Sequence, residues 1–419
     1  MVTNSPTSFE FTGFLSQDLG RPEHKTDPYP FYRWLREDQP IHQGAYGDVI
    51  VTRYADTVQV LRDPLFSSSS LNHNEQYKAI RPMLEEQPAI APLLVLQDKA
   101  MLTMDPPDHT RLRRLASKAF STRAVDALRP RAEQVVAEAL DAVEAWGTGE
   151  IEVVHDLAYP LPITLICEML GVPVEDRDLF EEWTPAAIKI IDPSDDFSLM
   201  LEAGEAVRHF MDYFRSLIER RRSSPGDDLL TGLIAAEDEG DRLTEDELLA
   251  TCILLLIAGH ETTVNLIGNG LLALLRHPDQ LSRLRDDPSL MGSAVEEALR
   301  YDAPVQLTAR TAVEEREVAG QVITKGQQVV TLLGAANRDP AQFADPDRFD
   351  VGRNDRSHMA FGGGIHVCLG APLARLEARC AFAGVLDRWS SLELVEEEPP
   401  RKETVTLRGL SELRLAVSR

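Results

Sequence analysis

Cysteine is scarce in this chain of 419 residues, and its four cysteines form neither a C-x-x-C pair nor a zinc-binding spacing. Widely separated thiols in a chain of this length are typical of a reducing compartment rather than of a disulfide framework. Cys167, Cys252 and Cys380 lie in apolar or helical stretches and are predicted to be core residues. Cys368 differs because glycines surround it.

Long hydrophobic runs are missing as well. No uninterrupted apolar run approaches the roughly 18 residues that cross a membrane, and residues 1–14 have neither the basic nor the apolar region of a signal peptide. We therefore expect a cytoplasmic protein with no membrane segment. Basic residues are also fewer than acidic ones, 43 against 68, which gives a net charge of −25. This charge argues against general nucleic-acid binding.

Repeats, low-complexity tracts and long linkers are absent too, so the chain is predicted to form a single domain over 1–419. A chain of this length buries about three quarters of its unfolded surface, enough for a large core. The hydrophobic spacing predicts a mainly α fold with a smaller β portion. Helices are expected over 30–37, 124–145, 159–170, 198–222, 244–276 and 371–388, and strands near 49–52, 318–323, 328–331 and 405–417.

Segment 244–276 is predicted to be the longest helix, about 50 Å from end to end. Thr244 and Glu247 form a T-x-x-E capping box at its start. Its centre is apolar until residues 259–263, which are expected to interrupt the helix with a glycine, the charged Glu261 and two hydroxyls. Such groups in a buried helix cost free energy unless they are paired or used, so this break is a candidate functional feature.

Segment 361–373 carries the clearest chemical signal. Three glycines ahead of Cys368 let the backbone approach something flat and bulky. The helix expected after it, with Pro372 in its first turn, offers N–H groups and a dipole that favour a thiolate. These residues suit a thiolate that binds a soft metal, and a structural cysteine is the plain alternative. A phosphate loop is disfavoured because Gly-Lys-Ser/Thr is absent.

The letters FGGGIHVCLG of this segment resemble the haem-binding loop of the cytochromes P-450, the haem-thiolate monooxygenases, at every diagnostic position. The resemblance extends from Asp27 to the tail and implies the family's triangular, mainly α prism with a small β portion. It also implies haem b as the cofactor, with Cys368 as the axial thiolate ligand of the iron, an arrangement that favours O–O cleavage.

Residues 258–263, AGHETT, are similar to the family's A-G-x-D/E-T-T motif. The resemblance implies that Glu261 feeds protons into the site and that the Thr262 hydroxyl stabilises iron-bound peroxide. A hydroxyl that bonds back to a helix carbonyl is the plain alternative for Thr262. His260 is not expected to be a metal ligand, because no partner stands at ligand spacing.

Segment 105–113 matches the family's D-P-P-x-H-x-x-x-R pattern, and its His109 and Arg113 share one helix face. The resemblance implies that these two hold the haem propionates together with Arg310 and His366, because buried propionates need cationic partners. A solvated helix face is the alternative for His109 and Arg113.

Glu297 and Arg300 match the family's E-x-x-R motif, and Arg348 is the expected third member of its Glu-Arg-Arg cluster. We interpret this cluster as structural, since removing one partner of a buried ion network costs about 3–5 kcal/mol.

The resemblance implies monooxygenation, in which one oxygen atom of O2 enters a C–H or C=C bond and the other leaves as water. The chain carries no flavin or iron–sulfur signature, so a ferredoxin and a ferredoxin reductase are expected to supply the electrons to a monomeric enzyme. Five basic residues form either a docking patch for the ferredoxin or a solvated helix face: Arg111, Arg114, Lys118, Arg375 and Arg379.

Two other functions are weighed against this interpretation. A peroxygenase replaces the acid–alcohol pair by an arginine-containing variant, which Glu261 and Thr262 disfavour. A protein that only binds or senses a haem ligand does not need that pair.

The substrate is expected to be lipophilic, because the segments that contact it in the family are apolar here. The residues concerned are Leu93, Leu94, Val95, Ile188, Ile190, Val305 and Leu307. Segment 258–270 is similar to that of actinobacterial macrolide- and polyketide-tailoring hydroxylases, so a macrolide or polyketide is the favoured class. A steroid, a terpene, a fatty acid and a substrate tethered to a carrier protein are the alternatives.

Overall fold

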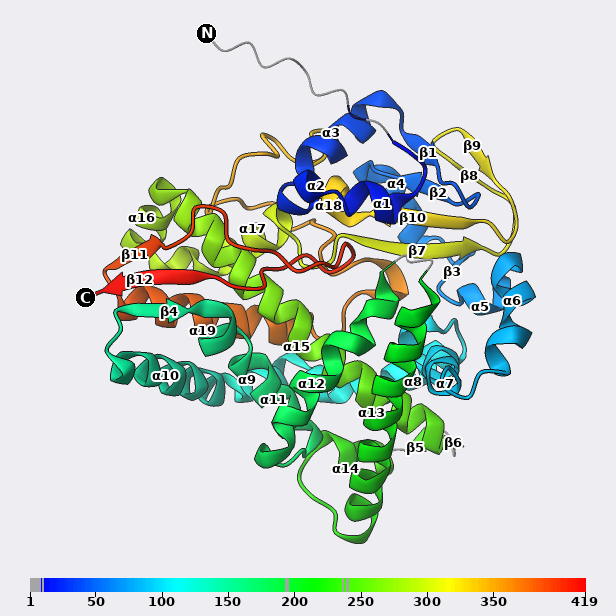
Figure 1. Ribbon diagram of the computed structural model, residues 1–419, viewed down its shortest axis with the longest axis horizontal. Coiled ribbons are helices and arrows are strands. Elements are labelled where there is room, and N and C mark those ends of the chain that lie inside the picture. The colour runs from blue at the N-terminus through cyan, green and yellow to red at the C-terminus, as the bar shows by residue number, and fades with distance from the viewer. Residues whose placement is uncertain (1–8, 10, 193–195, 236, 239–240) are drawn as a thin grey trace.

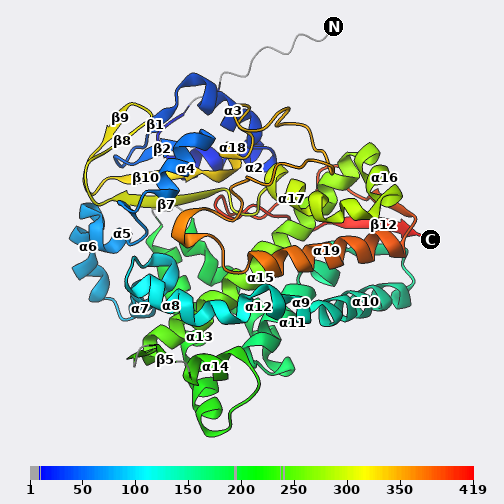
Figure 2. The same cartoon turned by 180° about the vertical axis from the view of Figure 1, so that it is seen from behind.

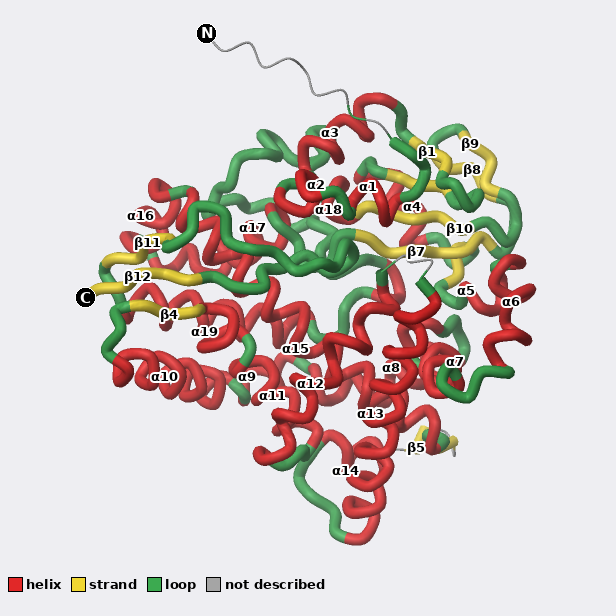
Figure 3. Tube along the Cα trace, viewed as in Figure 1, coloured by secondary structure: helices red, strands yellow, loops and turns green. Residues whose placement is uncertain are grey.

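The computed structural model describes residue 9 and residues 11–192, 196–235, 237–238 and 241–419. Within them, most helices fill one side of the molecule, and the main sheet lies on the other together with the first helices of the chain (Figure 1). Figure 3 shows the same division, with red helices below and left of the larger group of yellow strands. The mainly α fold with a smaller β portion is confirmed.

The main sheet pairs strands from the first 70 residues with strands from residues 307–332. Its five strands stand in the order β1-β2-β10-β7-β3, and β2 pairs with β10 in parallel while the other neighbours are antiparallel. A second sheet has the order β11-β12-β4. The strands of these sheets are β1 Ile41–Gln43, β2 Val49–Val51, β3 Phe66–Ser67, β4 Glu150–Glu152, β7 Leu307–Ala312, β10 Gln328–Leu332, β11 Ser391–Leu394 and β12 Arg414–Ser418.

Two strand predictions needed correction. The run 318–323 is a turn and parts of two strands, β8 (Arg316–Val318) and β9 (Gln321–Ile323), because Ala319 and Gly320 adopt positive φ values of 48° and 82° that close a hairpin. The tail 405–417 is a strand only from Arg414 onward; the stretch before it makes isolated bridges and packs as a loop.

Helix α15 (Glu245–Arg276) lies at the centre of the helical side. The predicted capping box is confirmed, since the side chains of Thr244 and Glu247 each accept the other's backbone N–H. Around α15 pack α7 (Ala91–Lys99), α11 (Pro160–Leu170), α13 (Phe197–Ser223), α17 (Met291–Tyr301) and α19 (Ala371–Arg388). By length and composition α15 alone among the described helices could span a membrane, but 72% of its most apolar window is buried inside the protein, as in a core helix.

The remaining helices surround this centre. The predicted helix 124–145 is two helices, because Pro130 sits in the first turn of a new one, α10 (Arg129–Trp146). The others are α1 Leu15–Leu19, α2 Pro22–Thr26, α3 Tyr29–Asp38, α4 Tyr54–Arg62, α5 Ser70–His73, α6 Glu75–Glu85, α8 Asp108–Ser117, α9 Thr122–Ala127, α12 Arg177–Ile188, α14 Leu229–Ala235, α16 Pro278–Asp286 and α18 Leu333–Ala336, with short strands β5 Glu237–Asp238 and β6 Asp241–Arg242.

The expected interruption of α15 at 259–263 is wrong, because the helix continues through it. Two of its polar side chains bond within the helix instead. The Thr262 hydroxyl donates to the Ala258 carbonyl at 3.0 Å, and His260 Nδ1 donates to the Leu256 carbonyl at 2.7 Å. Gly259 is needed for packing, since a Cβ there would lie 2.9 Å from the Ile166 side chain of α11.

Candidate functional site

Cys368 stands on a tight loop that leads into α19, which packs against α15 (Figure 2). The loop closes through the Cys368 N–H, which donates to the Phe361 carbonyl at 2.9 Å. Gly364 has a φ of 64°, and a Cβ there would lie 2.1 Å from the Leu61 carbonyl oxygen, so only glycine fits. The glycines therefore place Cys368 directly ahead of the helix N-terminus.

The Cys368 thiol is the accessible one of the four. Cys167, Cys252 and Cys380 are buried, as predicted, and burial raises the pKa of Cys380 to about 11. Burial by the surrounding chain also raises the pKa of the Cys368 thiol, while the N–H groups of Gly370 and Ala371 act in the opposite direction. These donors would stabilise a thiolate once a metal replaced the proton.

Basic side chains from three segments converge beside this loop. His109 of α8 and His366 of the loop lie ring against ring, 4.2 Å between centroids. Arg113 donates from Nη2 to the Val367 carbonyl at 2.6 Å. Burial lowers the pKa of His366 to about 3, and the nearby charges of Arg310, His109 and Arg113 add to that effect. The four predicted propionate partners are thus neighbours.

Among the described residues, no carboxylate lies within ion-pair distance of this basic cluster (His109, Arg113, Arg310 and His366), although the charge of Asp105 acts on His109 and Arg310 from farther away. Within the part of the chain that the structure describes, neither ring nitrogen of His109 has a hydrogen-bond partner, nor does Nε2 of His366. Among the described residues Arg310 donates to Thr308 and to the Ala309 carbonyl, and burial lowers its pKa to about 10. Buried donors without an anion are costly, so the cluster suits a ligand that brings carboxylates.

The centre of α15 has one accessible face. Ala258 is exposed and Thr262 half-exposed, although most residues of the helix are buried. Glu261 points elsewhere: its side chain is buried, and its Oε1 accepts a hydrogen bond from Lys402 Nζ at 2.5 Å. Nothing in the spacing of the sequence had pointed to Lys402.

Glu377 is a second residue that sequence reasoning missed. This carboxyl on α19 is fully buried, and burial raises its pKa well above the ordinary value, with Thr263 of α15 acting in the opposite direction. It shares the buried face of α19 with Leu373 and Ala381, at i−4 and i+4. A charged residue on an otherwise apolar helix face was the available signal.

The Glu-Arg-Arg cluster forms with a different third member. Glu297 makes a bidentate pair with Arg300, 2.8 Å at both contacts, and both side chains are fully buried. The second arginine is Arg353, whose Nε lies 3.0 Å from Glu297. Arg348 was the wrong choice, because its side chain is exposed and only its carbonyl takes part, accepting from Arg300 and Arg353.

The expected basic docking patch is smaller than predicted. Arg111 pairs with the buried Glu247, and Arg375 makes a bidentate pair with Glu296 and lies over the Phe361 ring at 4.5 Å. These two arginines therefore form ion pairs with buried carboxylates of the protein itself. Arg114 and Lys118 are exposed on and just after α8, and Arg379 bonds the Arg375 carbonyl.

The apolar residues expected to contact a substrate are buried or half-buried on α7, at the end of α12 and just after it, and at or just before the start of β7. Among the described residues, no three His, Cys, Asp or Glu side chains come together as a metal site. A metal at Cys368 would therefore take its other ligands from a non-protein group, and a flat, dianionic haem fits both the glycine loop and the basic cluster.

Comparison with known proteins gives the same assignment. The family model for cytochrome P450 matches residues 43–414. The biotin biosynthesis cytochrome P450 of Bacillus subtilis is 42% identical over 95% of this chain and 98% of its own length. The 6-deoxyerythronolide B hydroxylase of Saccharopolyspora erythraea is 46% identical over 75% of this chain and 76% of its own.

A solved structure supports the fold. P450BioI in complex with a hexadec-9Z-enoic acid-ligated acyl carrier protein has a TM-score of 0.87 and 41% identity, over 94% of this chain and 99% of that one. The expected fold and the haem-thiolate cofactor of the family are confirmed. The chain is a member of the cytochrome P450 family and a haem-thiolate monooxygenase.

Proposed function

We propose that Cys368 is the axial thiolate ligand of a haem b iron and that His109, Arg113, Arg310 and His366 hold the haem propionates. The observation that carries this proposal is the meeting of an accessible thiol with a basic cluster that has no carboxylate within ion-pair distance among the described residues. Bound there, the haem supplies the activation of O2, so that one oxygen atom enters a C–H or C=C bond and the other leaves as water.

Glu261 and Thr262 are proposed to deliver the protons that this reaction consumes. The Thr262 hydroxyl, on the accessible face of α15, donates back to Ala258 and can instead turn its proton toward the site. Glu261 precedes Thr262 and lies on another face of α15, beside Lys402, from where its carboxyl is proposed to supply the next proton. The small Ala258 side chain leaves room beside the hydroxyl.

The substrate is proposed to be a lipophilic natural product, with a macrolide or polyketide favoured. The similarity to the 6-deoxyerythronolide B hydroxylase supports that class. A fatty acyl chain, free or tethered to a carrier protein, is a second candidate, which the similarity to P450BioI in its acyl-carrier complex supports. Steroids and terpenes stay as alternatives.

The partners are proposed from chemistry and charge. A ferredoxin and its reductase supply electrons one at a time to a monomeric, single-domain, cytoplasmic enzyme. Arg114 and Lys118 are the exposed cations proposed to meet the ferredoxin. Charge reversal at Arg114 should slow reduction several-fold at low salt, with the difference shrinking as salt screens the contact. An unchanged rate would remove this surface from consideration.

The ligand assignment is tested by Cys368→Ser. The variant should lose the red-shifted absorption band of the reduced carbonyl complex that a thiolate ligand produces. Cys380→Ser is the matched control, because it makes the same change at a buried cysteine of α19 and should keep the band. A band that survived in Cys368→Ser would end the assignment.

The substrate class is tested by titrating the ferric protein with macrolides, polyketide fragments, steroids, terpenes and fatty acids while following the haem absorption band. A spin-state shift with one class identifies the pocket's preference. Shifts only with acyl chains linked to a carrier protein would favour the second candidate and contradict the macrolide assignment.

A further inference from the structure

The C-terminal loop 401–409 covers a polar stripe on α15. Glu261, Asn265 and Asn269 recur every four residues, so they share one face of the helix. Lys402 Nζ bonds Glu261, Gly409 lies so close to Asn265 that a Cβ would come within 1.9 Å of its amide oxygen, and Asn269 donates to the Arg408 carbonyl at 2.9 Å. The loop therefore meets the helix at three successive turns.

The backbone around Lys402 is held from several directions. The Lys402 N–H donates to the Gly409 carbonyl at 3.1 Å, and the preceding Arg401 reaches Asp302 at 3.3 Å. Farther along the loop, the N–H groups of Val405 and Thr406 donate to the Asp192 carboxylate at 3.1 and 2.8 Å. The Lys402 side chain therefore extends from a backbone that hydrogen bonds hold in place.

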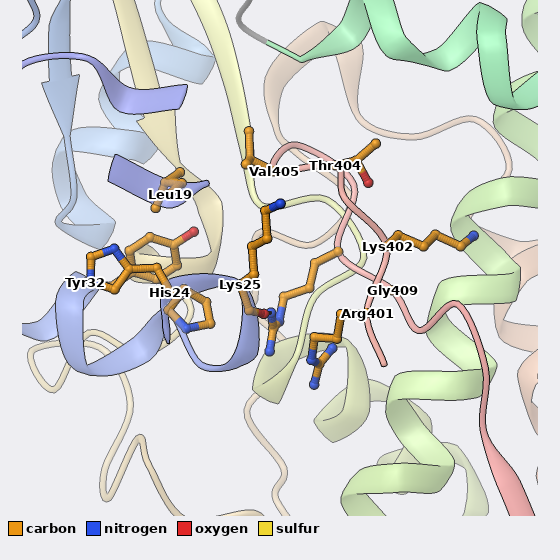
Figure 4. A pocket seen from close by; sticks show the side chains of 11 residues that line it. Leu19, His24, Lys25, Tyr32, Arg401, Lys402, Thr404, Val405 and Gly409 are labelled. Atoms are coloured by element: carbon orange, nitrogen blue, oxygen red, sulfur yellow. Dashed lines mark hydrogen bonds between the residues drawn. The ribbon is translucent and has the colours of Figure 1, made fainter. Parts of the chain in front are cut away.

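Figure 4 shows Lys402 pointing away from its loop neighbour Arg401 and from Lys25. Its side chain is 21% exposed, whereas that of Glu261 is 10% exposed. The two groups therefore connect the solvent edge of the loop to the centre of α15.

The other titratable groups beside Glu261, His260 and Tyr159, carry no positive charge that could pair with its carboxylate. His260 is buried, and burial lowers its pKa, so it stays neutral. Its ring meets that of Tyr159 edge-on, 5.8 Å between centroids, and burial raises the pKa of Tyr159 above its ordinary value. Lys402 is the cation that the structure sets against Glu261.

We propose that Lys402 is the positioning residue of Glu261, holding its carboxylate charged and oriented between turnovers so that it takes its next proton at the solvent edge of the loop. This inference rests on the proposed proton role of Glu261. Solvent gives a proton to the Glu261 carboxylate, and the neutral carboxyl, no longer held by Lys402, turns and passes that proton into the site; two such transfers supply the two protons that one monooxygenation consumes.

The charge of Lys402 is what matters, so Lys402→Met, Lys402→Gln and Lys402→Arg separate charge from chain length. A buried carboxylate that loses its cationic partner favours the protonated form. Lys25→Met is the matched control, since Lys25 pairs with Glu403 on the same loop and does not touch Glu261.

The direct measurement is a pH titration of the infrared carbonyl band of protonated Glu261, identified by its absence in Glu261→Gln. The midpoint should move up in Lys402→Met and Lys402→Gln and stay at the wild-type position in Lys402→Arg and Lys25→Met. The acid limb of the pH profile of the product-formation rate should shift by the same amount as the infrared midpoint.

An infrared midpoint that did not move in either uncharged variant would overturn the inference. Failure of the proposed proton role has a different signature: Glu261→Gln would then divide its electrons between product and peroxide as the wild type does, while the infrared midpoint still reported on the ion pair.

Discussion

His109 and His366 come from α8 and from the Cys368 loop, yet their rings lie 4.2 Å apart, and Arg113 and Arg310 crowd the same place. The two arginines repel each other, burial and arginine charge hold the pKa of both histidines down, and among the described residues the ring nitrogens of His109 and Nε2 of His366 have no hydrogen-bond partner. This arrangement costs free energy, and a negatively charged ligand bound beside the four side chains would offset that cost.

Arg310→Met should therefore weaken haem retention. The change removes a buried donor pair while keeping an unbranched apolar stem, and a hydrogen bond to a charged group is worth about 1.5–3 kcal/mol. Loss of haem to an excess of a haem-binding acceptor should become roughly ten- to a hundredfold faster. Arg316→Met, at the half-exposed hairpin strand β8, should retain haem like the wild type. Equal rates for both variants would contradict the assignment of Arg310.

Thr262→Val should uncouple electron consumption from product formation without preventing substrate binding. The substitution keeps the shape of the side chain and removes the proton that the hydroxyl contributes, so the share of electrons recovered as product should fall roughly tenfold or more in favour of peroxide. The substrate-induced spin shift should persist. Thr251→Val, in the same helix at a hydroxyl that has no partner among the described residues, should remain coupled.

Glu297→Ala should destabilise the fold by about 3–5 kcal/mol, because it leaves the buried Arg300 without its carboxylate. Arg353→Ala should cost a measurable fraction of that amount. Arg348→Ala should stay within about 0.5 kcal/mol of the wild type, since only its backbone carbonyl enters the cluster. Urea unfolding of the three variants checks the ranking, and a large loss in Arg348→Ala would mean that the Arg348 side chain belongs to the cluster after all.

Asp302 should make stability depend on pH in the acid range. The guanidinium groups of Arg408 and Arg401 lower the pKa of this buried carboxyl to about 2, whereas an unfolded aspartate titrates near about 3.9. The unfolded chain therefore binds more protons in this range, and the stabilisation is complete above about pH 4 and lost as the pH falls toward 2.

Asp302→Asn should be less stable at neutral pH and flatter in this acid window. The check is the free energy of unfolding in urea at several pH values, with Asp347→Asn, on a half-exposed pair, as the control. A wild-type slope in Asp302→Asn would mean that another carboxyl carries the acid loss.

Local patterns determined much of what this chain is. The glycine loop, Cys368 and the helix behind it are neighbours in sequence, so their spacing alone predicts their geometry. The same holds for the capping box at Thr244 and for the long helix, whose length follows from its apolar spacing. The resemblance of these motifs to the cytochrome P450 loop and helix then predicted the fold and the cofactor.

Tertiary structure decided which distant groups meet. Arg348 and Arg353 both follow Glu297 at plausible distances along the chain, and only the path of the backbone between them selects Arg353. No spacing rule connects Lys402 to Glu261 or fixes the environment of Glu377, because these contacts depend on how the C-terminal loop and α19 pack on α15. Sequence periodicity reports which face of an element is buried; the partner of each buried charge is chosen by packing among all the elements that reach it.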